Sequence, residues 1–228
     1  MLKFEFEDWG LIKYKEAWDK QNEYVSQIQK GKRRSTLVFC EHPSVVSIGK
    51  NGSKENLLRS DSYFEKNDVD LVWTSRGGDV TMHNPGQLVA YPLFDLNHFK
   101  TDLHWFLRNL EEAVIMTISE FGISGTRVDG LTGVWVDQKR KICAMGLHCA
   151  RWVTSHGLAL NVMNDMSEFD YIIPCGIEDK KVTSMKMEID NIKSQKNVLN
   201  KSSLGTELDV DFAQEVKEML KSKIKYVF

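Results

Sequence analysis

The chain has 228 residues, of which 42% are hydrophobic and 27% are charged, a composition typical of a globular protein with one core. Its net charge of −2 argues against a general nucleic-acid-binding surface, and the sequence has no apolar run approaching the roughly 18 residues that a membrane span needs. The acidic N-terminus resembles neither a secretory signal nor a mitochondrial transit peptide. We therefore expect a cytoplasmic protein with a single domain over residues 1–228.

Helices and short strands are predicted along the chain from the spacing of apolar residues. The first helix is expected over 14–28 with Gly31 as its terminator, the second over 103–121 between a cap at Thr101 or Asp102 and Gly122, and the third over 211–223. The expected strands are 36–40, 45–48, 69–73, 89–94, 133–136, 142–145 and 158–162. The charged residues 137–140 predict a hairpin between two of these strands.

The strands occur in groups and do not alternate strictly with helices. This grouping favours an α+β fold with a mixed β-sheet flanked by helices over a doubly wound fold. Residues 186–207 are polar, and we expect them to form a loop or extension before the last helix.

The segment Arg76–Gln87 is the densest in unusual residues, with three glycines, a proline, an arginine and a histidine between two expected strands. Glycine lets a backbone approach a ligand closely, and arginine suits a carbonyl or an anion. A purely structural turn that uses glycine for positive φ explains the same residues equally well.

Four cysteines are present, at positions 40, 143, 149 and 175, and free thiols are expected in a chain without an export signal. Cys175 lies between Pro174 and Gly176, on a fixed turn where a nucleophile can meet a substrate. A cysteine of this kind is nevertheless more often inert than catalytic.

Two further segments contain candidate functional residues. Lys141 opens an apolar run, so its side chain can be drawn inward, although a lysine at a strand start is usually on the surface. His156 precedes Gly157 and is either a base or a hydrogen-bonded structural residue. No cofactor or metal is expected, because phosphate-loop and metal-ligand spacings are missing.

Taken together and in this order, these segments resemble the octanoyltransferase family of lipoate biosynthesis, within the biotin and lipoate protein ligase catalytic-domain superfamily. Residues 76–87 match R-G-G-x-x-T-x-H-G-P-G-Q, residues 156–161 match H-G-L-A-L-N, and residues 174–176 match P-C-G. Lys141 and the following loop that ends at Gly146 match the family's lysine segment. The chain departs from the pattern at Asn84, where the family has glycine; asparagine tolerates left-handed backbone geometry, so we expect the loop to keep its shape.

The resemblance implies an acyltransferase that moves an octanoyl group from octanoyl-acyl carrier protein to a lysine of a lipoyl domain, through a thioester on cysteine. By analogy the catalytic residues are Cys175 and Lys141. The resemblance also implies substrate-binding residues in three loops: Arg76, Gly77, Gly78, Asp79, Val80, Thr81, Met82 and His83; Ala144, Met145 and Gly146; Gly157, Leu158 and Ala159. The acceptors that it implies are lipoyl domains of 2-oxoacid dehydrogenase complexes and the glycine cleavage H protein.

An acidic carrier protein needs a local basic patch on this enzyme. The candidate patches are residues 30–34, 139–140 and 180–181, each of which can also be an ordinary solvated face.

Two other functions compete with the transferase. An ATP-dependent lipoate or biotin protein ligase shares the expected fold, but an adenylating ligase needs no cysteine nucleophile. A non-catalytic module that binds lipoyl domains or acyl proteins also fits the fold, although keeping both Lys141 and Cys175 argues against it.

Overall fold

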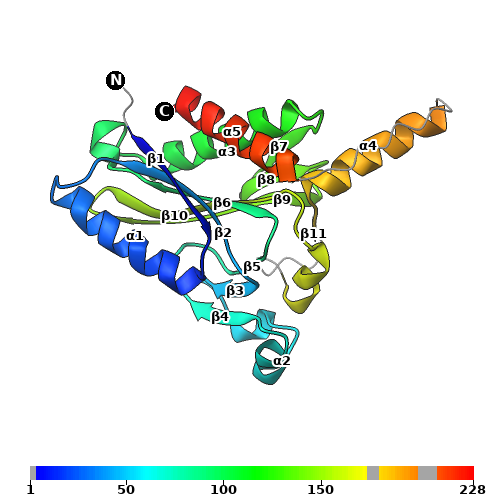
Figure 1. Ribbon diagram of the computed structural model, residues 1–228, viewed down its shortest axis with the longest axis horizontal. Coiled ribbons are helices and arrows are strands. Elements are labelled where there is room, and N and C mark those ends of the chain that lie inside the picture. The colour runs from blue at the N-terminus through cyan, green and yellow to red at the C-terminus, as the bar shows by residue number, and fades with distance from the viewer. Residues whose placement is uncertain (1–3, 174–179, 200–209) are drawn as a thin grey trace.

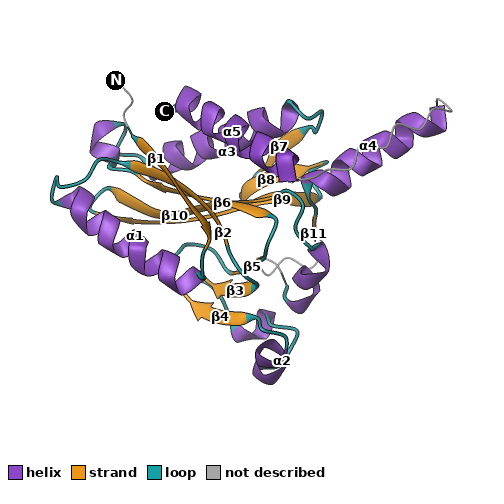
Figure 2. Ribbon diagram, viewed as in Figure 1, coloured by secondary structure: helices purple, strands orange, loops and turns teal. Residues whose placement is uncertain are grey.

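The computed structural model describes residues 4–173, 180–199 and 210–228. Its main sheet is mixed, and Figure 2 shows its strands between layers of helices. The strand order is β1 (Glu5–Leu11), β2 (Thr36–Glu41), β6 (Gln87–Leu93), β10 (Val153–Asn161), β9 (Arg140–Ala150), β8 (Leu131–Val136) and β7 (Gly125–Val128), with β11 (Lys181–Val182) paired to β9. The pairs β1–β2 and β9–β11 are parallel, and the other pairs in this sheet are antiparallel.

A second sheet of three strands has the order β4 (Asp70–Trp73), β3 (Val45–Ile48) and β5 (Val80–His83). It has its own apolar cluster, to which α2 (Asp61–Lys66) contributes the fully buried Phe64. The strand β5 lies inside the segment expected to be a loop. The expectation was incomplete because β5 pairs with β3, which is distant in sequence.

Helices cover both faces of the main sheet. Figure 1 shows α1 (Tyr14–Gln29) on one face, and α3 (Leu103–Ser119) with α5 (Val210–Val227) on the other. Each helix buries the apolar stripe that predicted it, and Asp102 caps α3 through a hydrogen bond from the Trp105 N–H. These layers confirm the expected α+β fold with a mixed sheet flanked by helices. In the described part of the chain, no helix is both long and apolar enough to cross a membrane.

The predicted hairpin is confirmed by the antiparallel pairing of β8 with β9. Its turn places Asp137 and Gln138 at φ values of 50° and 57°, the left-handed geometry that tight hairpin turns need. The strand β1 escaped prediction because it contains Asp8 and Gly10, residues that strands disfavour. Its register with β2 is set by the crossover through α1.

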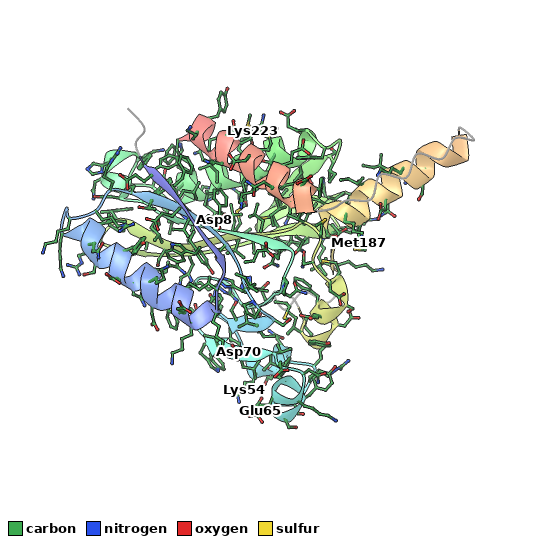
Figure 3. The ribbon with its side chains drawn as sticks, viewed as in Figure 1. Asp8, Lys54, Glu65, Asp70, Met187 and Lys223 are labelled. Carbon is green, nitrogen blue, oxygen red and sulfur yellow. The ribbon has the colours of Figure 1, made fainter. Side chains whose placement is uncertain are left out.

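The expectation of a loop over 186–207 was wrong for its first half, since α4 spans Met185–Leu199. Residues 185–199 are polar, but they contain no glycine or proline, and their three lysines favour helix. Ile189 and Ile192 pack against the main core, while the rest of α4 projects away from the sheets (Figure 1). Figure 3 labels Met187 at the root of this projecting helix.

Candidate functional site

A cavity of about 470 Å³ is lined by residues of both sheets and of α1 and α3. The strands β9 and β10 contribute one wall through residues 144–146 and 157–159. Both segments were expected to be loops, but they lie inside these strands, where they pair with each other. Strand β5 and the loop before it contribute another wall. The cavity falls within the usual size range of small-molecule sites.

Thirteen of the fourteen residues expected to contact substrate line this cavity. The other, Met82, is fully buried in the apolar cluster of the three-stranded sheet. Neighbouring residues of a strand point to opposite faces, so Thr81 and His83 face the cavity while Met82 faces away from it.

Lys141 also lines the cavity, at the start of β9, and only 8% of it is exposed. Its side chain is thus drawn inward while Lys139 stays exposed. Cys175 lies outside the described residues. The described chain on both sides of it is anchored: the Ile173 N–H donates to the Asn56 carbonyl at 2.8 Å, and Val182 pairs with Lys141 through β11.

The guanidinium of Arg76 is buried and fixes the path of residues 76–79, which we call the glycine loop. It donates to the Ser47 hydroxyl at 3.1 Å, the Ser47 carbonyl at 2.5 Å, the Gly77 carbonyl at 3.0 Å and the Asp79 carbonyl at 2.7 Å. The loop turns through Gly78 at a φ of 84°. Five donors in a fixed fork suit several backbone acceptors at once.

The glycine loop lies directly on β9. The Gly77 N–H donates to the Leu147 carbonyl at 2.8 Å, and a Cβ added at Gly146 would come within 2.6 Å of the Gly77 carbonyl oxygen. Glycine at position 146 therefore allows two backbones to meet at the cavity wall.

His83 and His156 are buried at the cavity wall, and the ring of His42, also buried, lies 5.8 Å from that of His83. Burial lowers the pKa of His42 to about 4 and that of His156 to about 3, where the positive charge of Arg76 also contributes. The pKa of His83 is also well below its usual value, chiefly because of burial and also because of the nearby positive charge of Arg76. All three rings are thus neutral near pH 7.

His156 is held on several sides. Its φ is 56°, its backbone N–H donates to the Gln21 side chain at 2.8 Å, and its ring nitrogens lie 3.5 Å from the Tyr14 hydroxyl and 3.2 Å from the Ser75 hydroxyl. These contacts favour a positioned hydrogen-bonding residue over a base.

The explanation offered for Asn84 from sequence was wrong. Asn84 is not among the residues with positive φ, and its side chain is buried. Its amide N–H donates to the Asp165 carbonyl at 2.8 Å, and its oxygen accepts from the Asn164 side chain at 2.9 Å. The residue ties the turn after β5 to the segment after β10.

Sequence reasoning missed several residues of the cavity wall. Tyr14, Leu103 and Leu107 belong to helical stripes that predicted burial, and the same pattern cannot tell a core contact from a cavity wall. Leu131 and Thr132 start β8 and carried no signal.

Of the three candidate basic patches, the structure brings two together. Pairing of β11 with β9 places Lys181 beside the 139–140 turn, where the Lys181 N–H donates to the Lys139 carbonyl at 3.1 Å. In the third patch, Arg33 pairs with Glu7 and Arg34 pairs with Glu5 on β1.

Cys40, Cys143 and Cys149 are free thiols. Burial raises the pKa of Cys149, and it raises the pKa values of Cys40 and Cys143 well above the ordinary value, which disfavours the thiolate that a nucleophile needs. Within residues 4–173, 180–199 and 210–228, no group of three metal-ligating side chains could hold an ion.

Comparison with known proteins agrees with this geometry. Residues 13–201 match the family described as lipoyl protein ligase A/B catalytic domain. An octanoyltransferase of Cytophaga hutchinsonii is 46% identical over 210 residues, covering 84% of this chain and 86% of that protein. An octanoyltransferase of Christiangramia forsetii is 48% identical over 195 residues, covering 79% and 83%.

Solved structures share the fold at low sequence identity. A T. acidophilum protein with bound lipoic acid superposes with a TM-score of 0.70 at 14% identity, covering 99% of this chain and 86% of that one. A lipoate-protein ligase A bound with ATP gives a TM-score of 0.59 at 15% identity, covering 96% and 94%.

Proposed function

Since the chain belongs to the lipoyl protein ligase A/B catalytic domain family and is an octanoyltransferase of protein lipoylation, we propose that it transfers the octanoyl group through a thioester on Cys175. The observation that supports this most directly is the cavity, because it gathers Lys141 and three motif segments that are far apart in sequence. The described chain on the C-terminal side of residues 174–179 pairs with the strand of Lys141 through Val182.

In the first step, the Cys175 thiolate attacks the thioester carbonyl of octanoyl-acyl carrier protein. A new carbon–sulfur bond forms, the bond to the carrier thiol breaks, and the carrier leaves as a thiol after taking up a proton. A thiol nucleophile suits this exchange because one thioester replaces another and the acyl group stays reactive.

In the second step, the amine of a lipoyl-domain lysine attacks the octanoyl-Cys175 thioester. An amide bond forms, the Cys175 sulfur departs, and the amine proton leaves with it or through a neighbouring base. We assign as acceptors the lipoyl domains of 2-oxoacid dehydrogenase complexes and the glycine cleavage H protein.

Lys141 has two functions in this proposal. Its ammonium favours the thiolate of Cys175, and it exchanges the proton that the sulfur, the carrier thiol and the amine pass among them. Residues 76–83, 144–146 and 157–159 hold the acyl chain, and Met82 supports this wall from the apolar cluster of the three-stranded sheet. Free thiols at Cys40, Cys143 and Cys149 accord with a reducing compartment such as the cytoplasm.

Mass spectrometry of the intact protein tests the proposal. After incubation with octanoyl-acyl carrier protein and no ATP, the wild type should gain one octanoyl group that hydroxylamine removes. Cys175→Ala should gain none, whereas Cys149→Ala, which removes a half-buried thiol, should behave as the wild type. Transfer that persists in Cys175→Ala would refute the covalent route.

A ligase remains the competing function, because a lipoate-protein ligase A that binds ATP shares the fold. The same incubation separates the two functions, since a ligase would modify its acceptor with free octanoate only when ATP is present.

A further inference from the structure

Lys141 is a buried cation, and removing an ammonium from water has a large free-energy cost unless its surroundings stabilise the charge. The structure shows one such surrounding group. The Nζ atom of Lys141 lies 4.7 Å from the centroid of the Trp135 ring, within the distance at which an aromatic face attracts a cation.

The strand register makes this contact specific. Trp135 on β8 pairs directly with Lys141 on β9, beside an irregularity in the ladder between Val134 and Trp135. Residues paired across an antiparallel ladder project from the same face, so the strand pairing itself places the ring beside the ammonium. Trp135 is only 1% exposed, and its surroundings hold the ring in place.

Hydrogen bonding does not explain why position 135 holds an indole. The Trp135 Nε1 atom is buried, and among the described residues it has no hydrogen-bond partner. A buried N–H without an acceptor destabilises the fold, and phenylalanine would fill core space without it. Tryptophan, however, has the ring face that binds cations best.

The same ring also lies near Lys180, where the described chain resumes after residues 174–179. The Nζ atom of Lys180 lies 5.9 Å from the Trp135 ring centroid and donates to the Gln138 carbonyl at 2.7 Å. Lys180 is five residues after Cys175 in sequence. One ring therefore lies beside both the proposed catalytic lysine and the described end of the chain that leads from the cysteine.

We propose that Trp135 is the positioning residue of Lys141: its buried face holds the ammonium at the cavity wall, ready for the chemistry of Cys175. This inference rests on the proposed function. A ring face attracts the ammonium without adding a carboxylate, which would compete with a thiolate for the same charge.

The first measurement examines the contact without using transfer activity. Competitive acetylation with acetic anhydride, read by peptide mass spectrometry, compares Lys141 with the exposed Lys139 in the same molecule. In Trp135→Leu, Lys141 should acetylate roughly tenfold faster than in the wild type, and Lys139 should not change. An unchanged rate at Lys141 would overturn the proposal.

The second measurement asks whether Trp135 acts through Lys141. Trp135→Leu should slow single-turnover octanoyl transfer roughly tenfold with little change in KM, and Trp135→Phe, which keeps a weaker ring, should lose less than about threefold. In a Lys141→Met background, Trp135→Leu should have no further effect. Equal slowing in both backgrounds would show that Trp135 only packs the core.

Phe94→Leu is the matched control, because Phe94 is fully buried in the core and does not line the cavity. It should leave Lys141 acetylation and transfer close to wild type. If Trp135→Leu does not fold, Trp135→Phe replaces it, with Lys141 acetylating about threefold faster than in the wild type. A wild type that never gains an octanoyl group would refute the proposed transfer, and the acetylation result would still decide the contact.

Discussion

The loop of Arg76 and the strand of Lys141 each bring a buried cation to the same cavity, but they hold it differently. Arg76 donates to the hydroxyl and carbonyl of Ser47 and to the carbonyls of Gly77 and Asp79, so its guanidinium fixes the path of the loop. Lys141 lies against the face of Trp135. The comparison indicates two uses of a buried positive charge. A cation that donates to several backbone carbonyls stabilises the fold, whereas a cation held by a ring face is kept for the reaction.

Replacing Lys141 should show the largest effect and leave the fold nearly intact. We expect Lys141→Met to slow octanoyl transfer at least about a hundredfold, because both charge and proton exchange are lost. Single-turnover mass spectrometry measures the rate, and Lys139→Met is the exposed control. If iodoacetamide alkylation of Cys175 has the same pH midpoint in the wild type and in Lys141→Met, Lys141 is not the partner of the thiolate.

Replacing Arg76 should show the reverse pattern, with stability affected first. Arg76→Met removes a charged group that makes four hydrogen bonds, two of them buried and two partly buried, and should lower the free energy of unfolding by about 3 kcal/mol. Arg76→Lys should not restore stability, since an ammonium cannot reproduce the planar fork. Urea denaturation measures both variants, with the exposed Arg59→Met as control. If Arg76→Met has the same free energy of unfolding as the wild type, Arg76 does not stabilise the fold, and the contrast with Lys141 is wrong.

The turn after β5 provides a smaller test. Asn84→Gly, which sequence reasoning predicts to be neutral, should destabilise the protein by about 2 kcal/mol, because two side-chain hydrogen bonds are lost. Asn84→Asp should destabilise the protein at least as much, because it loses the donor to Asp165 and buries a carboxylate beside that carbonyl, although it keeps the acceptor for Asn164. Urea unfolding at equilibrium decides between the two explanations of Asn84.

The three buried histidines, His42, His83 and His156, should make the free energy of unfolding depend on pH. Their folded pKa values lie below the ordinary value of 6.5, so the unfolded chain binds more protons and stability falls as pH falls. From pH 6.5 down to about 4, where His42 titrates in the fold, each histidine contributes up to about 1.4 kcal/mol per pH unit.

His42→Gln should therefore flatten the decline in unfolding free energy between pH 6.5 and 5, measured by urea titration at several pH values. His104→Gln, which alters an exposed histidine on α3, should leave the slope as it is. A wild type with equal stability at pH 7 and pH 5 would contradict the assignment of neutral buried rings.

Much of this architecture could be predicted from local patterns. The apolar stripe of 103–121 located α3 because burying one helical face is what stabilises a surface helix, and the residues between two apolar runs located the β8–β9 hairpin. The strand β5 could not be predicted, because its partner β3 is some thirty residues away in sequence and pairing depends on the fold.

The candidate site was predictable to a similar extent and for similar reasons. Motif residues identified most of the cavity wall, but they could not show that Met82 faces the opposite core or that Leu107 faces the cavity. The orientation of a side chain depends on register and on packing between distant elements. The position of Cys175 stays a prediction, because it falls outside the described residues.

The helix α4 has a mechanical consequence for this site. Its fifteen residues extend over about 22 Å, and most of that length stands clear of the sheets (Figure 1). Near its root, buried Glu188 accepts hydrogen bonds from Arg140 at 2.8 and 3.0 Å and from Thr183 at 2.6 Å. We therefore expect a displacement of the outer end of α4 to reach Arg140, the residue that immediately precedes Lys141.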